Sequence, residues 1–131
     1  MKKLNCFISQ PMHGKKTDEV KERREQIINE IAKAIEKRHN LTYKVDFEIN
    51  VVNPVERFKH PLKAGRLWYL GKAISDMDMA DVVIFDKNAS NLASGCKIEY
   101  LTAVEYKKPC YSVTSPVLGE VGKFMKNSFI K

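Results

Sequence analysis

Hydrophobic and polar positions along the chain switch between the spacing of strands and the spacing of helices. A short apolar run, Leu4 to Ser9, is typical of a strand, and the polar segment up to Lys16 predicts a loop. Apolar residues then recur at helical spacing, at Val20, Ile27, Ile28, Ile31 and Ile35. We therefore expect a helix from Thr17 to Arg38, with Thr17 as its N-cap.

A different pattern follows, because apolar and polar residues alternate strictly from Thr42 to Val52. This period of two predicts a strand with one solvated face, and such a strand belongs at the edge of a sheet. Asn53-Pro54 ends it, and the segment from Val55 to Gly65 has no clear period. We expect a loop there, in a position to cover a ligand.

The rest of the chain alternates between helix and strand in the same way. The predicted elements are a helix from Arg66 to Met79, a strand Val82 to Phe85 buried on both faces, a loop Asp86 to Ala93, a helix Ser94 to Tyr106, a strand Pro109 to Val113, and a last helix with a terminal strand in 119–131. In the first of these helices the apolar stripe is Leu67, Leu70, Ile74 and Met77. It leaves Asp76 and Asp78 on the expected solvated side.

This alternation of strand and helix predicts an α/β fold with a parallel sheet between two helical layers. We expect one domain over residues 1–131, a Rossmann-like or flavodoxin-like three-layer sandwich with four or five strands. A strand order of 2-1-3-4 places the alternating second strand at the edge. The ligand crevice then lies between the first and third strands, where the order reverses.

Charge, cysteine content and the lack of long apolar runs limit the functions that we expect for this chain. The charge of +7 is scattered among acids, so nucleic-acid binding is not expected, and a small anionic ligand such as a nucleotide fits better. Cys6, Cys96 and Cys110 form no CxxC pair and are expected to be reduced. The chain has no membrane-spanning apolar run and no signal-peptide pattern, so we expect a cytoplasmic protein.

Three segments meet at the predicted crevice, and each offers groups that could bind a nucleoside or nucleotide. The candidate substrate-binding residues are Ser9, Gln10, Pro11, Met12, Gly14, Lys15, Lys16, Asn53, Ser94, Gly95 and Cys96. Helix N-termini and lysines suit a phosphate. The alternative is that Gly14 and Gly95 only permit tight turns and that the lysines are solvated. No metal and no cofactor are expected, since His13, His39 and His60 are widely dispersed.

Glu99 is the candidate catalytic residue. It lies one helical turn after Gly95, on the side of the turn that closes the crevice. A carboxylate there could attack the anomeric carbon of a sugar. Cys96, at the start of the same helix, could have a lowered pKa and act as a nucleophile, although a packing role fits it better. Asp81, before the buried strand, fits a turn or cap.

Five segments together carry a family resemblance. They are Phe7-Ile8-Ser9-Gln10-Pro11-Met12 with Gly14-Lys15, Val52-Asn53-Pro54, Tyr69-Leu70-Gly71-Lys72, Met79 to Phe85, and Ser94-Gly95-Cys96 with Glu99. Residues 4 to 113 resemble the small phage and bacterial proteins classed as nucleoside 2-deoxyribosyltransferase-like. The resemblance implies cleavage of an N-glycosidic bond with Glu99 as nucleophile. It also implies a homo-oligomer, for which Trp68 and Tyr69 are possible interface anchors or core residues.

The chain departs from the pattern of the transferases at three positions. Phe7 stands where they carry the tyrosine that orients the glutamate, and Ala73 and Ala93 stand where they carry aspartates that position and protonate the base. Three hypotheses follow, and the third of them is a bare interaction module. The first is an N-glycosidic hydrolase or deoxyribosyltransferase, and the second is a non-catalytic nucleotide-binding protein, a sensor or sequestering protein, that uses the same crevice.

Overall fold

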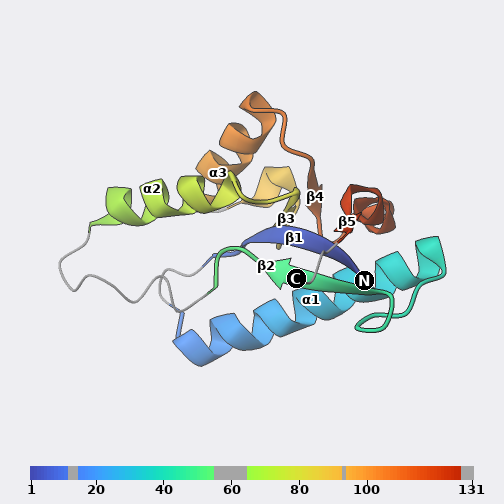
Figure 1. Ribbon diagram of the computed structural model, residues 1–131. Coiled ribbons are helices and arrows are strands. Elements are labelled where there is room, and N and C mark those ends of the chain that lie inside the picture. Colours follow the sequence, from blue (N-terminus) through green and yellow to red (C-terminus); the bar gives the residue numbers. More distant parts are fainter. Residues whose placement is uncertain (12–14, 55–64, 93, 128–131) are drawn as a thin grey trace.

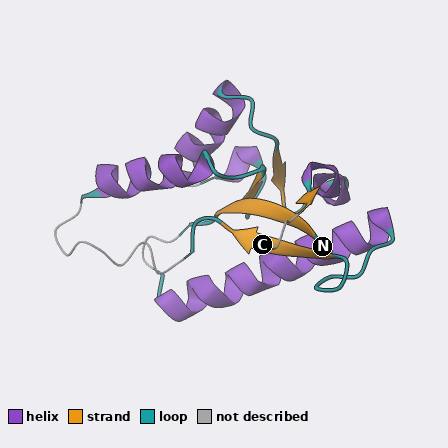
Figure 2. Ribbon diagram, in the orientation of Figure 1, coloured by secondary structure: helices purple, strands orange, loops and turns teal. Residues whose placement is uncertain are grey.

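The computed structural model describes residues 1–11, 15–54, 65–92 and 94–127 and confirms the predicted α/β class. A five-stranded, mostly parallel sheet lies between helices on both faces (Figures 1 and 2). α1 (Thr17–His39) and the 3₁₀ helix η3 (Leu118–Phe124) cover one face, and α2 (Arg66–Met77) and α3 (Ser94–Glu105) cover the other. A separate hydrophobic core fills the space on each side of the sheet.

The sheet has the strand order that the sequence predicted. β1 (Lys2–Ser9) lies between β2 (Phe47–Val51) and β3 (Val82–Phe85), and β4 (Cys110–Ser112) pairs with the outer side of β3. All of these pairs are parallel. Because the order reverses at β1, the carboxyl ends of β1 and β3 bound the crevice expected for a ligand. The short β5 (Lys126–Asn127) adds an antiparallel pair at the start of β1.

The first helix was predicted to within one residue at its end. α1 begins at Thr17, but its N-cap is Lys16 and not Thr17, so the predicted cap was wrong by one position. It ends at His39, and its C-cap Asn40 has the left-handed backbone, φ 55°, that commonly follows a helix. η3 packs against α1 so closely that a Cβ atom on Gly119 would lie 2.7 Å from the Ala34 carbonyl oxygen.

The second strand is shorter than the alternation predicted. β2 begins at Phe47, and Thr42 to Asp46 form a turn closed by backbone hydrogen bonds from Val45 and Asp46 to the Thr42 carbonyl. Lys44 in this turn has a left-handed φ of 67°, which no regular strand contains. Alternation therefore extended into a segment whose own hydrogen bonds favour a turn.

α2 is rotated relative to the predicted apolar stripe. Leu67 is 82% exposed, whereas Asp76, predicted to be solvated, is 1% exposed. The buried face carries Ala73 and Met77 beside Asp76. The predicted surface position of Asp76 was wrong because the small Ala73, not a leucine or isoleucine, packs towards the sheet.

Three further findings concern the cysteines, Asp81 and membrane-spanning helices. Cys6, Cys96 and Cys110 are free thiols, and the first two are buried. Asp81 accepts a hydrogen bond from the Asn5 backbone N–H and forms an ion pair with Lys126. The ion pair links β5 to the rest of the sheet. Among the described residues, no helix has the length and apolar character needed to cross a membrane.

Candidate functional site

Ser9 and Glu99 meet at the predicted crevice. Ser9 is the last residue of β1, and its hydroxyl donates a 2.7 Å hydrogen bond to the Glu99 carboxylate on α3. Asp86, the first residue after β3, donates its backbone N–H to the Ser9 carbonyl at 3.0 Å. The carboxyl ends of β1 and β3 and the first turns of α3 therefore come together around Glu99.

The environment of Glu99 favours its protonated form. Burial raises the pKa of Glu99 from 4.5 to about 7, and the Ser9 hydrogen bond and the positive charge of Arg24 offset only part of this effect. A carboxyl group with a pKa near neutral is suited to reactions in which a proton or a covalent bond is exchanged. Perturbed carboxyl groups of this kind cluster at functional sites.

Cys96 does not have the properties of an activated nucleophile. Burial raises the pKa of its thiol, and a hydrogen bond with Ser9 reverses only part of that rise. The lowered pKa considered from the sequence is therefore wrong, and the burial of Cys96 agrees with a packing role.

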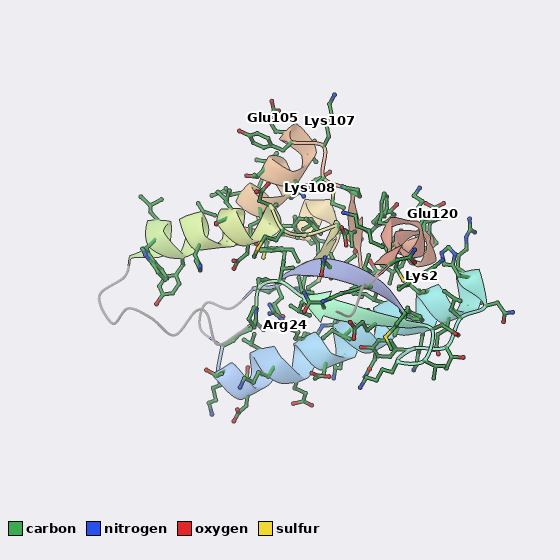
Figure 3. The ribbon with its side chains drawn as sticks, in the orientation of Figure 1. Lys2, Arg24, Glu105, Lys107, Lys108 and Glu120 are labelled. Atoms are coloured by element: carbon green, nitrogen blue, oxygen red, sulfur yellow. The ribbon has the colours of Figure 1, made fainter. Side chains whose placement is uncertain are left out.

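A buried arginine on α1 contacts the residues at the ends of β1 and β2. Arg24 is 5% exposed, and its guanidinium bonds to the Gln10 side chain at 2.7 Å, to the Asn53 carbonyl oxygen and to the Ile8 carbonyl oxygen at 3.3 Å. Figure 3 shows Arg24 between α1 and the sheet. It joins the ends of β1 and β2 to α1, so its charge reaches Glu99 from a fixed position.

Gln10 and Asn53 belong to the same supporting layer. The Asn53 amide accepts the Ile8 backbone N–H at 3.0 Å and donates to the Ile8 carbonyl at 2.8 Å. The Gln10 amide donates to the Val20 carbonyl at 3.1 Å. Both amides are thus engaged within the protein, and a direct ligand contact from either residue stays a prediction.

An ion pair joins α1 to the residue that follows β3. Arg23 bonds to one carboxylate oxygen of Asp86 through two nitrogens, at 2.6 and 2.9 Å. This hydrogen bond raises the pKa of Arg23. The Asp86 carboxylate is thus held as the partner of a cation, and its charge contributes to the raised pKa of the Cys96 thiol.

The other predicted binding residues lie before α1, at the start of α3, or outside the described residues. Pro11 is half-buried after β1, and Lys15 and Lys16 are exposed before α1. Gly95 lies in the first turn of α3 with open space around it and without a left-handed φ, so the alternative of a tight turn that requires glycine does not hold there. Ser94 begins α3. Met12, Gly14 and the predicted covering loop 55–64 lie outside the described residues.

Sequence reasoning missed Arg23, Arg24 and Asp86. Arg24 carried a usable signal, because it lies four residues after Val20 and three before Ile27 and therefore on the apolar face of the helix. Asp86 directly follows the buried strand, where parallel sheets place ligand-binding residues. Arg23 gave no signal, because it resembles the other solvated charges of α1.

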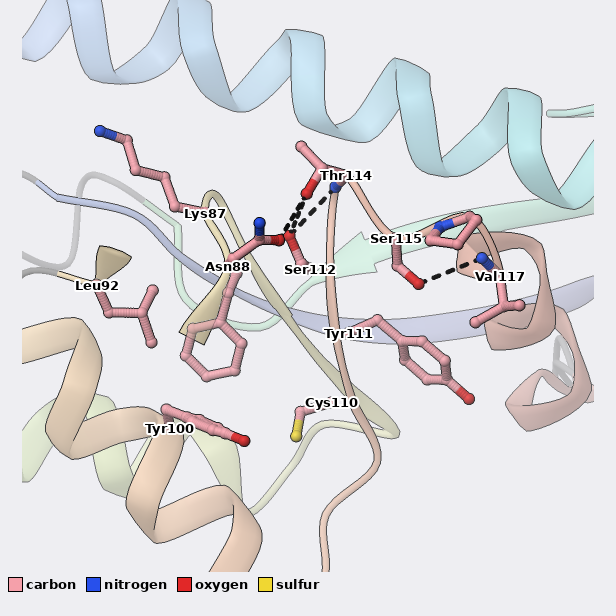
Figure 4. A pocket seen from close by; sticks show the side chains of 12 residues that line it. Lys87, Asn88, Leu92, Tyr100, Cys110, Tyr111, Ser112, Thr114, Ser115 and Val117 are labelled. Atoms are coloured by element: carbon pink, nitrogen blue, oxygen red, sulfur yellow. Dashed lines mark hydrogen bonds between the residues drawn. The ribbon is translucent and has the colours of Figure 1, made fainter. Parts of the chain in front are cut away.

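A cavity of about 740 Å³ is lined by β4 and by residues of the neighbouring segments (Figure 4). Phe85 and Tyr100 lie on one side of the strand, with ring centroids 5.6 Å apart in an edge-to-face arrangement. Hydroxyl and amide groups of Ser112, Thr114 and Asn88 line it and bond to one another. Glu99 does not line this cavity, although the next residue, Tyr100, does.

Among the described residues, no group of three histidine, cysteine, aspartate or glutamate side chains is arranged to hold a metal ion.

The raised pKa of Glu99 predicts a pH-dependent stability. The folded chain holds the Glu99 proton more tightly than the unfolded chain, so wild-type stability should fall as the pH rises from about 4.5 to about 7. The free energy of unfolding should fall by at most about 3 kcal/mol, and the fall is complete above that range. Glu99→Gln removes the ionisable group and should not show this fall. Urea unfolding of both proteins at pH 4, 6 and 8 measures the difference. The matched control is Glu22→Gln, because Glu22 lies on the exposed face of α1. Equal pH dependence of the stability of wild type and Glu99→Gln would contradict the prediction.

Removing the Ser9 hydroxyl should raise the pKa of Glu99 further. The Ser9 hydrogen bond favours the charged carboxylate, so Ser9→Ala is expected to move the titration upward by roughly one pH unit. Titration of the Glu99 side-chain carboxyl by carbon NMR measures this directly. Ser9→Thr keeps a hydroxyl and should titrate as wild type does. An unchanged or lower pKa in Ser9→Ala would show that the hydroxyl does not stabilise the carboxylate.

Comparison with family models, with curated proteins and with solved structures finds no match for this chain.

Proposed function

We propose that this chain is a nucleoside 2-deoxyribosyltransferase-like protein that cleaves the N-glycosidic bond of a nucleoside or nucleotide. Glu99 is the nucleophile, and the product is the free base together with a sugar transferred to water or to a second base. The observation that carries the proposal is the partly buried Glu99 carboxyl, held by Ser9 at the carboxyl end of β1 and with a pKa of about 7.

Ser9 supports the proposal because it offers a replacement for a missing group. The resemblance places an orienting tyrosine at Phe7, and Phe7 is fully buried in the core between the sheet and the helices α2 and α3. Ser9 follows two residues later, so it projects from the same face of β1. Its hydroxyl bonds to Glu99 and can fix the carboxylate in place of the tyrosine.

The reaction has two steps. In the first, an ionised oxygen of Glu99 attacks the anomeric carbon, the carbon–nitrogen bond breaks, and its electron pair goes to the base, which takes a proton from water. In the second, water or another base attacks the same carbon, the bond between that carbon and the Glu99 oxygen breaks and returns its electron pair to the carboxylate, and the attacking group gives up its proton to solvent. Since the pKa of Glu99 is about 7, the reactive ionised form increases with pH across the neutral range.

Other features of the crevice suit a nucleotide. Lys15 and Lys16 are exposed at the start of α1, where backbone N–H groups and positive charge favour a phosphate. Gly95 leaves open space at the start of α3, so a ligand could approach its backbone closely. The Phe85 and Tyr100 rings of the neighbouring cavity offer apolar contact area of the kind that a ligand ring uses.

The alternative is a non-catalytic nucleotide-binding protein that uses the same crevice. Ala73 and Ala93 favour it, because they lack the carboxyl groups that assist departure of the base in the transferases. The Asp86 carboxylate is paired with Arg23 and does not replace them. This alternative keeps the binding residues but gives Glu99 no covalent role.

Release of free base separates the two functions. The protein should be incubated with nucleosides, nucleoside monophosphates and NAD, with chromatographic detection of the free base and parallel calorimetry for binding. Base release that depends on Glu99 supports the enzyme. Tight binding of any of these ligands without base release contradicts it and favours the binding protein.

A further inference from the structure

The outer side of β4 carries main-chain groups that are available to another chain. β4 is the last strand on its side of the sheet, and no strand in the described part of the chain pairs with its outer side. Pro109 and Val113, on either side of β4, each form a backbone hydrogen bond of 2.9 Å with β3. Every second residue of a parallel strand bonds to the same neighbour, so Cys110 and Ser112 direct their N–H and C=O groups away from β3. Because the Ser112 carbonyl accepts the Ser115 N–H, both groups of Cys110 and the N–H of Ser112 are left.

Apolar surface borders this edge on both faces of the sheet. Tyr100 and Cys110 line the cavity of about 740 Å³ and pack against the core on the side of α2 and α3. Tyr111 lines the same cavity but packs against the core on the side of α1. Pro116 and Val117 add apolar lining from the segment that follows β4. Figure 4 shows Cys110 and Tyr111 on opposite sides of the strand, so the cavity offers space on each face of the edge.

The strand and the segment after it carry no charge. No residue from Pro109 to Gly119 is charged, although charged residues make up 30% of the chain. Natural proteins commonly place lysines or other charges on an exposed edge strand, because an edge without them pairs with other chains. The lack of charge at β4 therefore favours an edge that receives a partner.

We infer that the outer side of β4 binds an extended peptide segment of another protein, which pairs with Cys110 and Ser112 as an additional strand. In such strand addition, main-chain hydrogen bonds give affinity and pockets for alternate side chains give specificity. Successive peptide side chains lie beside Tyr100 on one face and beside Tyr111 on the other, so consecutive apolar residues fit the site. A peptide fits better than a small molecule, because another backbone matches the row of main-chain donors and acceptor. The inference does not rest on the proposed function, since Glu99 does not line the cavity.

Lys87 favours a peptide with an acidic residue. It is the one charged side chain among the described residues that line the cavity, and within the described part of the chain no ion pair involves it. Phe85 lies opposite Ser112 in the register, so Lys87, two residues later, is at the carboxyl end of β4. An aspartate or glutamate at that end of the peptide faces Lys87, and this complementary charge selects the sequence and the direction of binding.

Selection of peptides on the immobilised chain tests the inference. A phage-displayed library of random short peptides should yield sequences with consecutive apolar residues next to an aspartate or glutamate. Calorimetry with the synthetic form of the most enriched peptide then gives its dissociation constant. A library that yields no binder overturns the inference and leaves the cavity to a small molecule. Enriched peptides that lack this pattern overturn it as well.

N-methylation of single nitrogens in the enriched peptide separates strand addition from burial of side chains alone. A methyl group on a nitrogen that faces β4 removes a donor and blocks close approach, so the dissociation constant should rise at least about tenfold. Methylation of the neighbouring nitrogens, which face away from β4, should change it by less than about twofold. Equal effects at all positions would contradict pairing with the strand.

Two pairs of protein variants locate the site. Cys110→Pro removes an outer N–H but keeps the bonds to β3, and proline is accepted on edge strands, so the dissociation constant should rise at least about tenfold. Cys110→Ala keeps the N–H and should change it by less than about threefold. Lys87→Glu should weaken binding roughly tenfold, whereas Lys33→Glu on exposed α1 should have no effect.

Circular dichroism verifies the fold of each variant. If Cys110→Pro does not fold, the N-methylated peptides and Lys87→Glu decide the outcome. Unchanged affinity in both Cys110→Pro and Lys87→Glu would place the peptide elsewhere and overturn the inference.

Discussion

Glu99→Gln is expected to abolish the release of free base, with a loss of at least about 1,000-fold in kcat. The glutamine amide cannot form the glycosyl ester, and it keeps almost the same volume as the carboxyl group. Because Glu99 accepts the Ser9 hydroxyl, the amide oxygen can still accept it, so the crevice should keep its shape. Ligand binding should therefore change much less than turnover.

The measurement is base release by wild type and Glu99→Gln at several pH values, together with ligand affinity by calorimetry. Wild-type kcat should rise with an apparent pKa near 7, since ionisation of Glu99 produces the nucleophile. Glu22→Gln on α1 is the matched control and should turn over as wild type does. Unaltered turnover in Glu99→Gln would exclude Glu99 as the nucleophile. A kcat that falls as the pH rises through 7 would instead indicate a general acid.

The fold was predicted well because the spacing of hydrophobic residues extends over a whole helix or strand and does not depend on single contacts. The unbroken apolar run Val82–Phe85 predicted a strand covered on both faces, and β3 lies inside the sheet with every residue buried. The alternating segment predicted an edge strand, and β2 occupies an edge. These patterns predict the layer that each element occupies, and the connection rules for α/β folds then limit the strand order.

Prediction was weaker where a few residues decide the structure. The alternation from Thr42 to Val52 could not reveal that Thr42 accepts two turn hydrogen bonds, which shorten the strand. The buried face of α2 contains the polar Asp76, and a hydropathy pattern places such a residue at the surface.

The candidate site shows the same division between local pattern and long-range contact. Ser9, Cys96 and Glu99 were predicted from their places at the ends of a strand and a helix, and the structure brings them together. The contacts of Arg24 with Gln10 and Asn53 join three separate segments, and no spacing in the sequence encodes them. The part of the site that depends on α1 was therefore not predicted.

Asn53→Ala is expected to lower the free energy of unfolding by about 3 kcal/mol. Asn53 is 1% exposed, and its amide bonds to both the N–H and the carbonyl of Ile8, next to the end of β1. Alanine leaves the Ile8 N–H buried without that acceptor and opens a small cavity. A loss of this size is a large part of the stability of a typical domain.

Urea unfolding of wild type, Asn53→Ala and Asn50→Ala measures this effect. Asn50 makes the matched control, because the same substitution there removes only an exposed hydrogen bond to the Asn5 side chain and should cost about 0.5 kcal/mol or less. Equal losses for the two variants would contradict the structural role of Asn53. Because Asn53 anchors the backbone one residue before Ser9, its loss should also shift the NMR titration of Glu99. That shift would link the buried layer beneath the crevice to the carboxyl group that the proposed reaction requires.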